Sequence, residues 1–354
     1  MIYSFLRPLL FALPPELSHT LTLRALQMAG VVLPPPRLDD SALRVKALGL
    51  DFPNPFGLAA GFDKDALAMA GALKLGFGFC EVGTLTPQPQ AGNPRPRIFR
   101  LPKSQALINR MGFNNKGVAA AAQRLIYFRA EKNSAKRLIG VNIGANRQNA
   151  STIEASVSDY IKAAQIFKGL ADYITINISS PNTPHLRDLQ TAESARALMA
   201  AVRGVLPDTP ILVKIAPDLS PAAAIAIAES AIAENIAGLI ISNTTTSRAD
   251  ITSTESGGVS GAPLFTASTD LLRAVYRGIY KKGGTRLTLI GAGGISTPDQ
   301  AYAKIRAGAS LLQIYTSLVY HGPGLLNDLK KGLVARLHVD GFATIDEAIG
   351  ADHK

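Results

Sequence analysis

Residues 173–190 read YITINISSPNTPHLRDLQ, and this stretch changes character halfway along. Its first part, Tyr173 to Ile178, is rich in β-branched and aromatic residues, which favour a buried strand. The part from Ser179 to Pro184 consists of small polar residues and prolines, so the strand ends in a loop that carries hydroxyls and amides. In α/β proteins this carboxyl end is where ligands bind. A planar anion that forms hydrogen bonds suits these groups and Arg187, whereas a strand closed by an ordinary Asn-Pro turn is the alternative.

Similar apolar runs recur along the chain from residue 48 onward and alternate with alanine-rich helical stretches, among them Val118–Lys132, Ser194–Val205 and Pro221–Glu234. Parallel strands need crossover connections, which are usually helices. Eight such units in about 300 residues are typical of a (β/α)8 TIM barrel, an α/β fold, and a doubly wound open sheet is the alternative. The predicted strands are Pro55–Ala60, Phe79–Gly83, Leu138–Ile143, Tyr173–Ile178, Ile211–Ile215, Gly238–Ser242, Leu287–Gly291 and Leu311–Thr316.

The charge balance narrows the range of partners. The chain has 354 residues and a formal charge of +11, from 37 basic and 26 acidic residues. Its basic residues are scattered and have no aromatic residues among them, so nucleic acid is a weaker candidate than an anionic ligand or an anionic membrane surface. Cys80 is the single cysteine. It excludes a disulfide within the chain and indicates a reducing compartment.

The first 36 residues differ from the rest. Residues 1–13 and 15–33 are two apolar helical stretches, and Pro34-Pro35-Pro36 ends the second. The first is too short to span a bilayer and is a poor match to a signal peptide. We expect residues 1–36 to form a small helical module that either packs on the main body or lies in a membrane interface with Arg7 and Arg24 on its polar side. Residues 37–354 form the main domain, and residues 340–354 are expected to be a short exposed end.

Most predicted strands end in polar or glycine-rich sequence. Strand 7 ends in GAGGI, residues 291–295, and GVSGAP, residues 258–263, adds a second glycine turn. Glycines there leave backbone N–H groups free to face an anion, and in TIM barrels the loops after strands 7 and 8 often bind phosphate. A tight turn that needs glycine for its backbone angle is the alternative. Lys214 lies inside the apolar strand ILVKI, so its amino group must be paired or neutral.

The set of polar residues at the strand ends favours a bound organic cofactor. It has five asparagines and two lysines, with no histidine pair, HExxH motif or carboxylate cluster, so catalysis by a metal is not expected. Ser180 lacks the GxSxG motif of hydrolases. Amides and lysines hold and tune cofactors, and a lysine beside the N1 and O2 edge of a flavin stabilises the reduced ring. Together with a phosphate site these groups favour a mononucleotide flavin. The absence of a GxGxxG fingerprint after a strand counts against FAD or NAD in a Rossmann domain.

Eight ordered motifs resemble the class 2, quinone-linked dihydroorotate dehydrogenase family. They are LAAGFDKD, EVGTLTPQPQAGNPRPRIFRL, INRMGFNNKG, NISSPNTPHLR, SNTTTSR, GGVSGAPL, GAGGIS and QIYTSL, and they extend over essentially the whole chain. The resemblance implies that the protein oxidises (S)-dihydroorotate to orotate in pyrimidine biosynthesis, with FMN as hydride acceptor and ubiquinone or menaquinone as final acceptor. It also implies a bacterial form that is peripheral on the cytoplasmic side of the inner membrane and needs neither nucleic acid nor a partner protein.

The resemblance also implies residue roles. Ser180 is the expected general base, which takes the C5 proton; a cysteine occupies this position in class 1. His19 and Arg100 are expected in the quinone tunnel. The expected FMN-binding residues are Ala60, Gly61, Lys64, Thr84, Asn142, Asn177, Lys214, Ser242, Gly261, Gly293, Tyr315 and Thr316. The expected substrate-binding residues are Lys64, Asn109, Arg110, Met111, Gly112, Phe113, Asn177, Asn182, Asn243 and Thr244.

Two positions depart from the family pattern: His185 stands where glycine is usual, and Ser242 where threonine is commoner. Two other functions remain open from the residues. One is a related FMN barrel that uses a soluble electron acceptor, and the other is a barrel that binds phosphate without catalysis.

Overall fold

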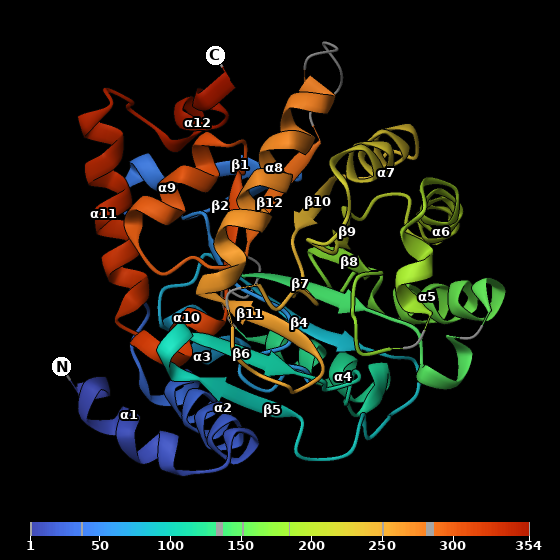
Figure 1. Ribbon diagram of the computed structural model, residues 1–354, viewed down its shortest axis with the longest axis horizontal. Coiled ribbons are helices and arrows are strands. Elements are labelled where there is room, and N and C mark those ends of the chain that lie inside the picture. Colours follow the sequence, from blue (N-terminus) through green and yellow to red (C-terminus); the bar gives the residue numbers. More distant parts are fainter. Residues whose placement is uncertain are drawn as a thin grey trace.

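A closed barrel of eight parallel strands forms the centre of the molecule (Figure 1). The computed structural model describes residues 2–36, 38–131, 137–150, 152–183, 185–249, 251–280 and 287–353. Going round the barrel, the strands follow the order in which they occur in the chain, as in a TIM barrel. They are β3 (Phe56–Leu58), β4 (Phe79–Leu85), β7 (Leu138–Ile143), β8 (Tyr173–Asn177), β9 (Ile211–Ile215), β10 (Gly238–Ile241), β12 (Thr288–Ala292) and β13 (Leu311–Ile314). Each coincides with a predicted strand, so the barrel is confirmed and the open sheet is excluded.

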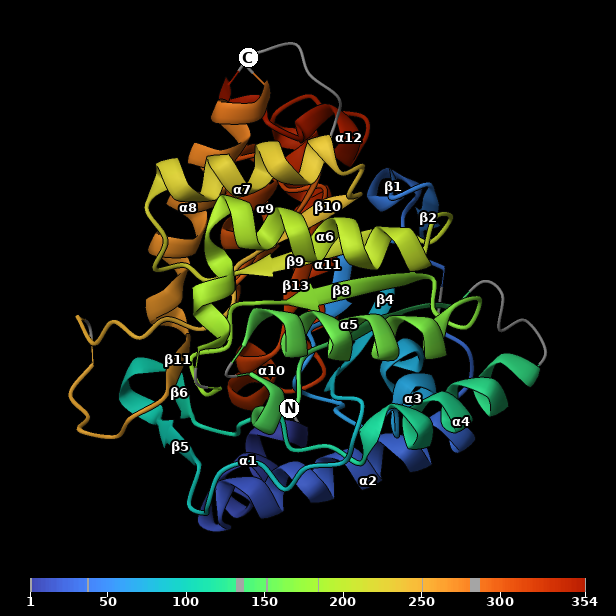
Figure 2. The same cartoon turned by 90° about the vertical axis from the view of Figure 1, so that its right-hand side faces the viewer.

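Helices cover the outside of the barrel (Figures 1 and 2). Several begin at side-chain caps, and Thr297 forms a complete capping box with Gln300. The predicted helices are confirmed apart from their ends, of which Lys132 lies outside the described residues. The covering helices are α3 (Met69–Lys74), α4 (Gly117–Ala130), α5 (Ile153–Phe167), α6 (Ala192–Val205), α7 (Pro221–Ala233), α8 (Phe265–Tyr280), α9 (Pro298–Arg306), α10 (Thr316–His321), α11 (Leu325–Val339) and α12 (Ile345–Ala348).

Large and small residues alternate in the barrel interior. The fully buried rings of Phe79 and Tyr173 lie with their centroids 6.3 Å apart. A Cβ atom on Gly57 would lie 2.2 Å from the Phe79 ring, and one on Gly140 would lie 2.0 Å from the Tyr173 ring. These two glycines therefore provide the space for the two rings, which fill the barrel as interior side chains do in TIM barrels.

Two small antiparallel sheets accompany the barrel. A hairpin of β1 (Val45–Ala47) and β2 (Leu50–Phe52) packs Phe52 against Phe79, with ring centroids 5.2 Å apart. The second sheet joins β5 (Ile98–Leu101), β6 (Ala106–Asn109) and β11 (Gly258–Gly261) in the order β11-β6-β5. None of these three strands was predicted from the sequence, where GVSGAP was expected to be a glycine turn. Strand β11 lies about 150 residues along the chain from β5 and β6, so local sequence patterns do not reveal that they pair.

The N-terminal helices α1 (Ile2–Ala12) and α2 (Pro15–Val32) lie beside β5 at one end of the molecule (Figure 2). Helix α2 crosses α3 closely, because a Cβ atom on Gly71 would lie 1.9 Å from the Leu26 carbonyl oxygen. Apolar side chains of both helices remain exposed, among them Phe5, Leu9 and Val31. None of the helices in the described ranges is both long enough and apolar enough to cross a membrane.

The C-terminal segment is not the exposed end that we expected from the sequence. Ile345 and Ala348 of α12 are fully buried. Further along, Arg306 pairs with Asp352, its Nε lying 2.7 Å from the carboxylate, and the His353 ring stacks on Tyr276 with a centroid distance of 4.9 Å. The expectation was wrong because two buried residues in a four-residue helix leave no periodic pattern in the sequence.

Candidate active site

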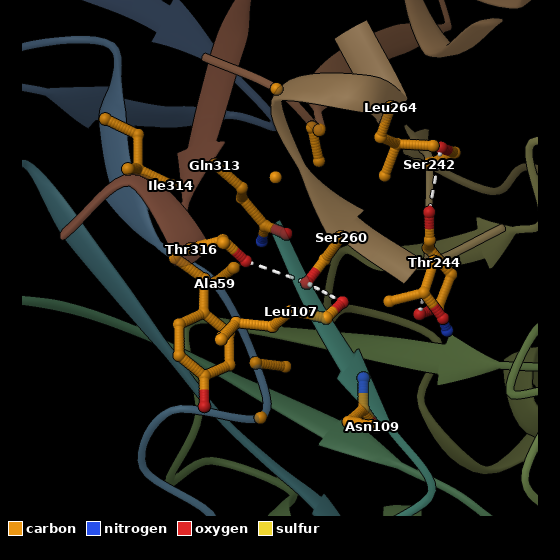
Figure 3. A pocket seen from close by; sticks show the side chains of 18 of the residues that line it. Ala59, Leu107, Asn109, Ser242, Thr244, Ser260, Leu264, Gln313, Ile314 and Thr316 are labelled. Carbon is orange, nitrogen blue, oxygen red and sulfur yellow. Dashed lines mark hydrogen bonds between the residues drawn. The ribbon is translucent and has the colours of Figure 1, made fainter. Parts of the chain in front are cut away.

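A deep pocket lies at the carboxyl ends of the barrel strands, and the sheet β11-β6-β5 forms one of its walls (Figure 3). In this wall Ser260 of β11 donates to the Leu107 carbonyl and accepts from Thr316, with a distance of 2.8 Å for the second bond. The pocket brings most of the predicted site residues together: Ala60, Gly61, Lys64, Thr84, Asn109, Met111, Gly112, Phe113, Asn177, Ser180, Asn182, Lys214, Ser242, Asn243, Thr244, Gly261, Gly293, Tyr315 and Thr316 all line it.

Four predicted site residues do not line this pocket. Asn142 is fully buried directly beneath it, where it accepts from Thr84 Oγ1 at 2.6 Å. The Arg110 guanidinium points away, pairs with Glu255 at 2.6 Å and lines a shallower surface hollow. His19 and Arg100 lie on the side of the N-terminal helices and are described below.

A buried carboxylate that the sequence analysis did not single out holds the floor of the pocket. Glu81 of β4 is fully buried and accepts four hydrogen bonds from side chains. Its Oε1 accepts from Asn142 Nδ2 at 2.8 Å, and its Oε2 accepts from Gln313 Nε2 at 2.7 Å. The hydroxyls of Tyr173 and Thr175 also donate to Oε2, both at 3.1 Å. An ionised carboxylate only accepts, so both amides must turn their NH2 groups toward it.

The orientation of Asn142 in turn sets the orientation of the next amide, which lines the pocket. Because Asn142 donates to Glu81, its carbonyl oxygen is free to accept from Asn177 Nδ2 at 3.2 Å. Asn177 Oδ1 then accepts from the backbone N–H of Ser179 at 3.2 Å and from Asn243 Nδ2 at 3.4 Å. Glu81 thus fixes the direction of a hydrogen-bonded chain that ends next to the loop carrying Ser180.

Ser180 itself is nearly buried, and its Oγ accepts from the backbone N–H of Asn182 at 3.3 Å. The Asn182 side chain donates to Asn109 Oδ1 at 3.2 Å, which joins the loop to the sheet wall. Arg187 holds the base of the loop by donating to the Ser179 carbonyl at 3.2 Å. The serine hydroxyl is therefore positioned by the backbone, in a loop fixed at both sides.

The two lysines of the pocket, Lys214 buried and Lys64 partly buried, both have lowered pKa values. Burial and the nearby charge of Arg97 lower the pKa of Lys64 to about 8, and its Nζ donates to the Gly61 carbonyl at 2.8 Å. Burial also lowers the pKa of Lys214, and the negative charge of Glu81 opposes that effect. Lys214 Nζ donates to Gln313 Oε1 at 3.2 Å, so Gln313 connects the lysine with the carboxylate.

Glycines after β12 bring the backbone close to the start of α8. Gly293 and Gly294 have φ values of +100° and +73°, and a Cβ atom on Gly294 would lie 2.6 Å from the Phe265 nitrogen. Phe265 is the first residue of α8, so the glycine turn lies against a helix N-terminus. Exposed N–H groups and the helix dipole favour a phosphate at such a place.

His19 and Arg100 connect the N-terminal helices to the barrel. The His19 ring lies edge-on to Phe62 at 5.2 Å and 6.5 Å from the ring of Tyr315, which lines the pocket. Burial lowers the pKa of His19 to about 3, so this histidine is neutral at physiological pH. Arg100 donates to the carbonyls of Leu10, Phe11 and Leu13 at the end of α1. Their roles in a quinone tunnel stay predictions.

His185, which stands where glycine is usual in the family, has a left-handed backbone conformation that glycine adopts readily. Its φ is +59°, in the left-handed region, and its side chain is exposed and lies 3.1 Å from Asp188. It directly precedes the short 3₁₀ helix η5 (Leu186–Gln190). The loop therefore keeps a glycine-like turn at a strain cost, and the imidazole points away from the pocket.

The fold and the site define a class of protein. A closed parallel barrel with amides, lysines and a glycine turn at the carboxyl ends of its strands is typical of barrel enzymes that bind a phosphate-bearing organic cofactor. In the part of the chain that the structure describes, no group of three or more potential metal ligands occurs.

Comparison with known proteins narrows this class. The sequence model of a family described as "Dihydroorotate dehydrogenase" matches residues 42–337. A protein of Parvibaculum lavamentivorans named "Dihydroorotate dehydrogenase (quinone)" is 49% identical over 99% of both chains. One of the same name from Anaeromyxobacter dehalogenans is 46% identical over 100% of this chain and 98% of its own. The ligand-free dihydroorotate dehydrogenase (DHODH) structure from Eimeria tenella superimposes with a TM-score of 0.87 at 38% identity, covering 96% of this chain and 99% of that one.

The chain belongs to the dihydroorotate dehydrogenase family, which is flavin-dependent. The predicted family, TIM-barrel fold and oxidoreductase class are thereby confirmed. The roles of individual residues stay predictions, although the structure gathers nearly all of them in one pocket.

Proposed function

We propose that this protein oxidises (S)-dihydroorotate to orotate in pyrimidine biosynthesis, with FMN as its flavin and a membrane quinone as final electron acceptor. The observation that carries the proposal is the pocket, in which Ser180, Lys64 and four asparagines meet Lys214 and the glycine turn. The names of the full-length relatives agree with this proposal. We also propose that residues 1–36 form the quinone module and residues 37–354 the catalytic domain.

The residues of the pocket fit a flavin mononucleotide. Lys214 would supply a positive charge to stabilise a reduced flavin ring, and the amides near it would supply neutral donors and acceptors. The turn at Gly293 and Gly294 with the start of α8 suits one phosphate. The chemistry that a bound flavin would supply is acceptance of the hydride from substrate C6 and transfer of the electrons to quinone.

The substrate would lie among amides and one partly buried cation. Asn109, Asn177, Asn182 and Asn243 come from three different segments of the chain, and their amide groups can both donate to and accept from a pyrimidine ring. Lys64 supplies the charge for the carboxylate of the substrate. Since the backbone and the network fix these side chains, they need little reordering when substrate binds.

Ser180 would take the proton from C5 as the hydride leaves C6. A serine hydroxyl is a weak base, so this transfer depends on two conditions: the neighbouring carbonyl must acidify C5, and the charge must be relayed onward. The buried Thr183 lies in the same loop and is our candidate for the relay. The bond from Asn182 N–H to Ser180 Oγ leaves the serine proton free to move toward such a partner.

Quinone would reach the flavin from the side of α1 and α2. Apolar side chains on these helices are exposed, and aromatic contacts lead from His19 through Phe62 to Tyr315 at the edge of the pocket. Such a helical pair suits peripheral binding in the interface of a membrane, which we place at the cytoplasmic face of the inner membrane.

A comparison of electron acceptors tests this proposal. Orotate formation by the purified protein is followed with a soluble quinone analogue, with fumarate and with NAD as acceptors. We expect turnover with the quinone analogue alone. Turnover with fumarate or NAD and none with quinone would favour the enzyme with a soluble acceptor and contradict the proposal. A colourless protein with no activity would indicate a barrel that binds phosphate without catalysis.

A further inference from the structure

A buried lysine lies behind the proposed phosphate site, outside the pocket. Lys304 belongs to α9 and is completely buried. Its chain runs past β12, since a Cβ atom on Gly291 would lie 3.1 Å from Lys304 Cδ. Neither the sequence motifs nor the proposed mechanism gives this residue a role.

Among the described residues, the groups in contact with the Lys304 amino group are all neutral. Its Nζ donates to Ser268 Oγ at 2.8 Å and to Thr269 Oγ1 at 2.9 Å, and it lies 5.3 Å from the centre of the Phe265 ring. No carboxylate pairs with it among the described residues. Asp270 and Arg273 act on it electrostatically in opposite directions. A buried cation without a counter-charge is costly, so the amino group of such a residue either loses its proton or is held charged by an anion nearby.

The two hydroxyls connect the lysine to the glycine turn. Ser268 shares its hydroxyl proton between the Phe265 carbonyl at 3.1 Å and the Gly293 carbonyl at 3.3 Å, and Thr269 donates to the Phe265 carbonyl at 2.6 Å. Since both hydroxyls use their protons on carbonyl oxygens, their lone pairs remain for Lys304. A single hydroxyl, that of Ser268, thus connects the Lys304 ammonium to the Gly293 carbonyl, and the ammonium lies against the first turns of α8 on the side away from the pocket.

We propose that Lys304 is a positioning residue for the cofactor phosphate: its charge lies beneath the turn at Gly293 and Gly294 and, with the start of α8, makes this site selective for a phosphorylated flavin. The inference rests on FMN as the cofactor. The phosphate would supply the missing counter-charge without direct contact, at a distance where low polarity keeps the attraction strong. Burial lowers the pKa of Lys304 to about 7, so the lysine is fully protonated near neutral pH only when an anion lies nearby.

Flavin exchange on the holoenzyme tests this role. Purified protein is equilibrated with a mixture of isotopically labelled FMN and riboflavin, and the composition of the bound flavin gives the ratio of the two affinities. The wild-type ratio should favour FMN strongly. In Lys304→Met we expect the ratio to fall about tenfold or more through the loss of one charge, while riboflavin binding stays unchanged. A merely structural lysine would weaken both flavins equally.

Two further variants show whether the charge of Lys304 itself matters, as opposed to its hydrogen bonds or the net charge of the protein. Lys304→Gln can still donate to both hydroxyls but has no charge, so it should lose FMN preference as the methionine variant does, and it also serves if the methionine variant does not fold. Lys331→Met removes an exposed lysine of α11 and should keep the wild-type ratio. An unchanged ratio in both Lys304 variants, a loss in the methionine variant only, or an equal loss in Lys331→Met would each overturn the proposal. A wild-type protein that does not prefer FMN would instead contradict the cofactor assignment.

Discussion

Replacing Glu81 with glutamine removes one charge and almost no volume. The carboxylate accepts from Asn142 at one oxygen and from Gln313, Tyr173 and Thr175 at the other. A glutamine must present an NH2 group to one of these two sides. The hydroxyls can rotate to accept, but each amide must turn over if it faces a donor.

Whichever way the new amide points, two hydrogen-bond donors come to face each other at the pocket. If NH2 faces Gln313, that side chain turns over and presents its own NH2 to Lys214. If NH2 faces Asn142, then Asn142 and Asn177 turn over in sequence, and two donors meet at the backbone N–H of Ser179. One buried donor is left unsatisfied in both cases, which costs about 1–3 kcal/mol.

Thermal unfolding of the holoenzyme measures this cost. We expect Glu81→Gln to lower the free energy of unfolding by about 1–3 kcal/mol, which corresponds to a drop of about 1–4 °C in Tm for a chain of this size. Thr175→Val is the matched control: it removes one donor to the same carboxylate, keeps the amides in place and should cost about 1 kcal/mol. A Glu81→Gln protein within about 0.5 kcal/mol of wild type would refute the idea that Glu81 fixes the amide orientations.

Three further predictions concern catalysis, pH and membranes. Ser180→Ala should keep its flavin but slow flavin reduction by dihydroorotate about 10²-fold or more, and near wild-type reduction in stopped-flow measurements would exclude the general base. The pKa of His19 lies near 3 in the folded protein and is higher in the unfolded chain, so NMR spectra at pH 5 should show a neutral ring. The contribution of His19 to stability should fall as the pH drops below about 6.5. A charged ring at pH 5 would contradict the lowered pKa. Phe5→Ser combined with Leu9→Ser should weaken binding to anionic vesicles at least tenfold, because each change removes about 2 kcal/mol of apolar burial. The control Ile126→Ser on α4 should leave vesicle binding unchanged. Equal effects of the two changes would argue against α1 as the membrane-binding surface.

The sequence was sufficient for the barrel because each of its strands is a short, mostly apolar and almost entirely buried run between turn signals. Strands β5, β6 and β11 were missed because their pairing is long-range and because their flanking prolines and glycines indicate a loop. Helix α12 was missed because its burial involves only Ile345 and Ala348.

Most of the site was predicted from motifs, since residues at strand ends must meet at one face of a barrel. Glu81 and Lys304 were not: nothing in the sequence reveals which side chains pair with Glu81, and Lys304 is one of three charged residues of the polar helix α9. Arg110 was expected at the substrate, but its guanidinium turns to Glu255, because an exposed long side chain finds its partner only in the folded chain.

Anaerobic titration of the purified protein with (S)-dihydroorotate tests the central claim most directly. The oxidised flavin should lose its visible absorbance with formation of one orotate per flavin, and a quinone analogue should restore it. A flavin that stays oxidised in the presence of excess dihydroorotate, in a folded protein, would contradict the account.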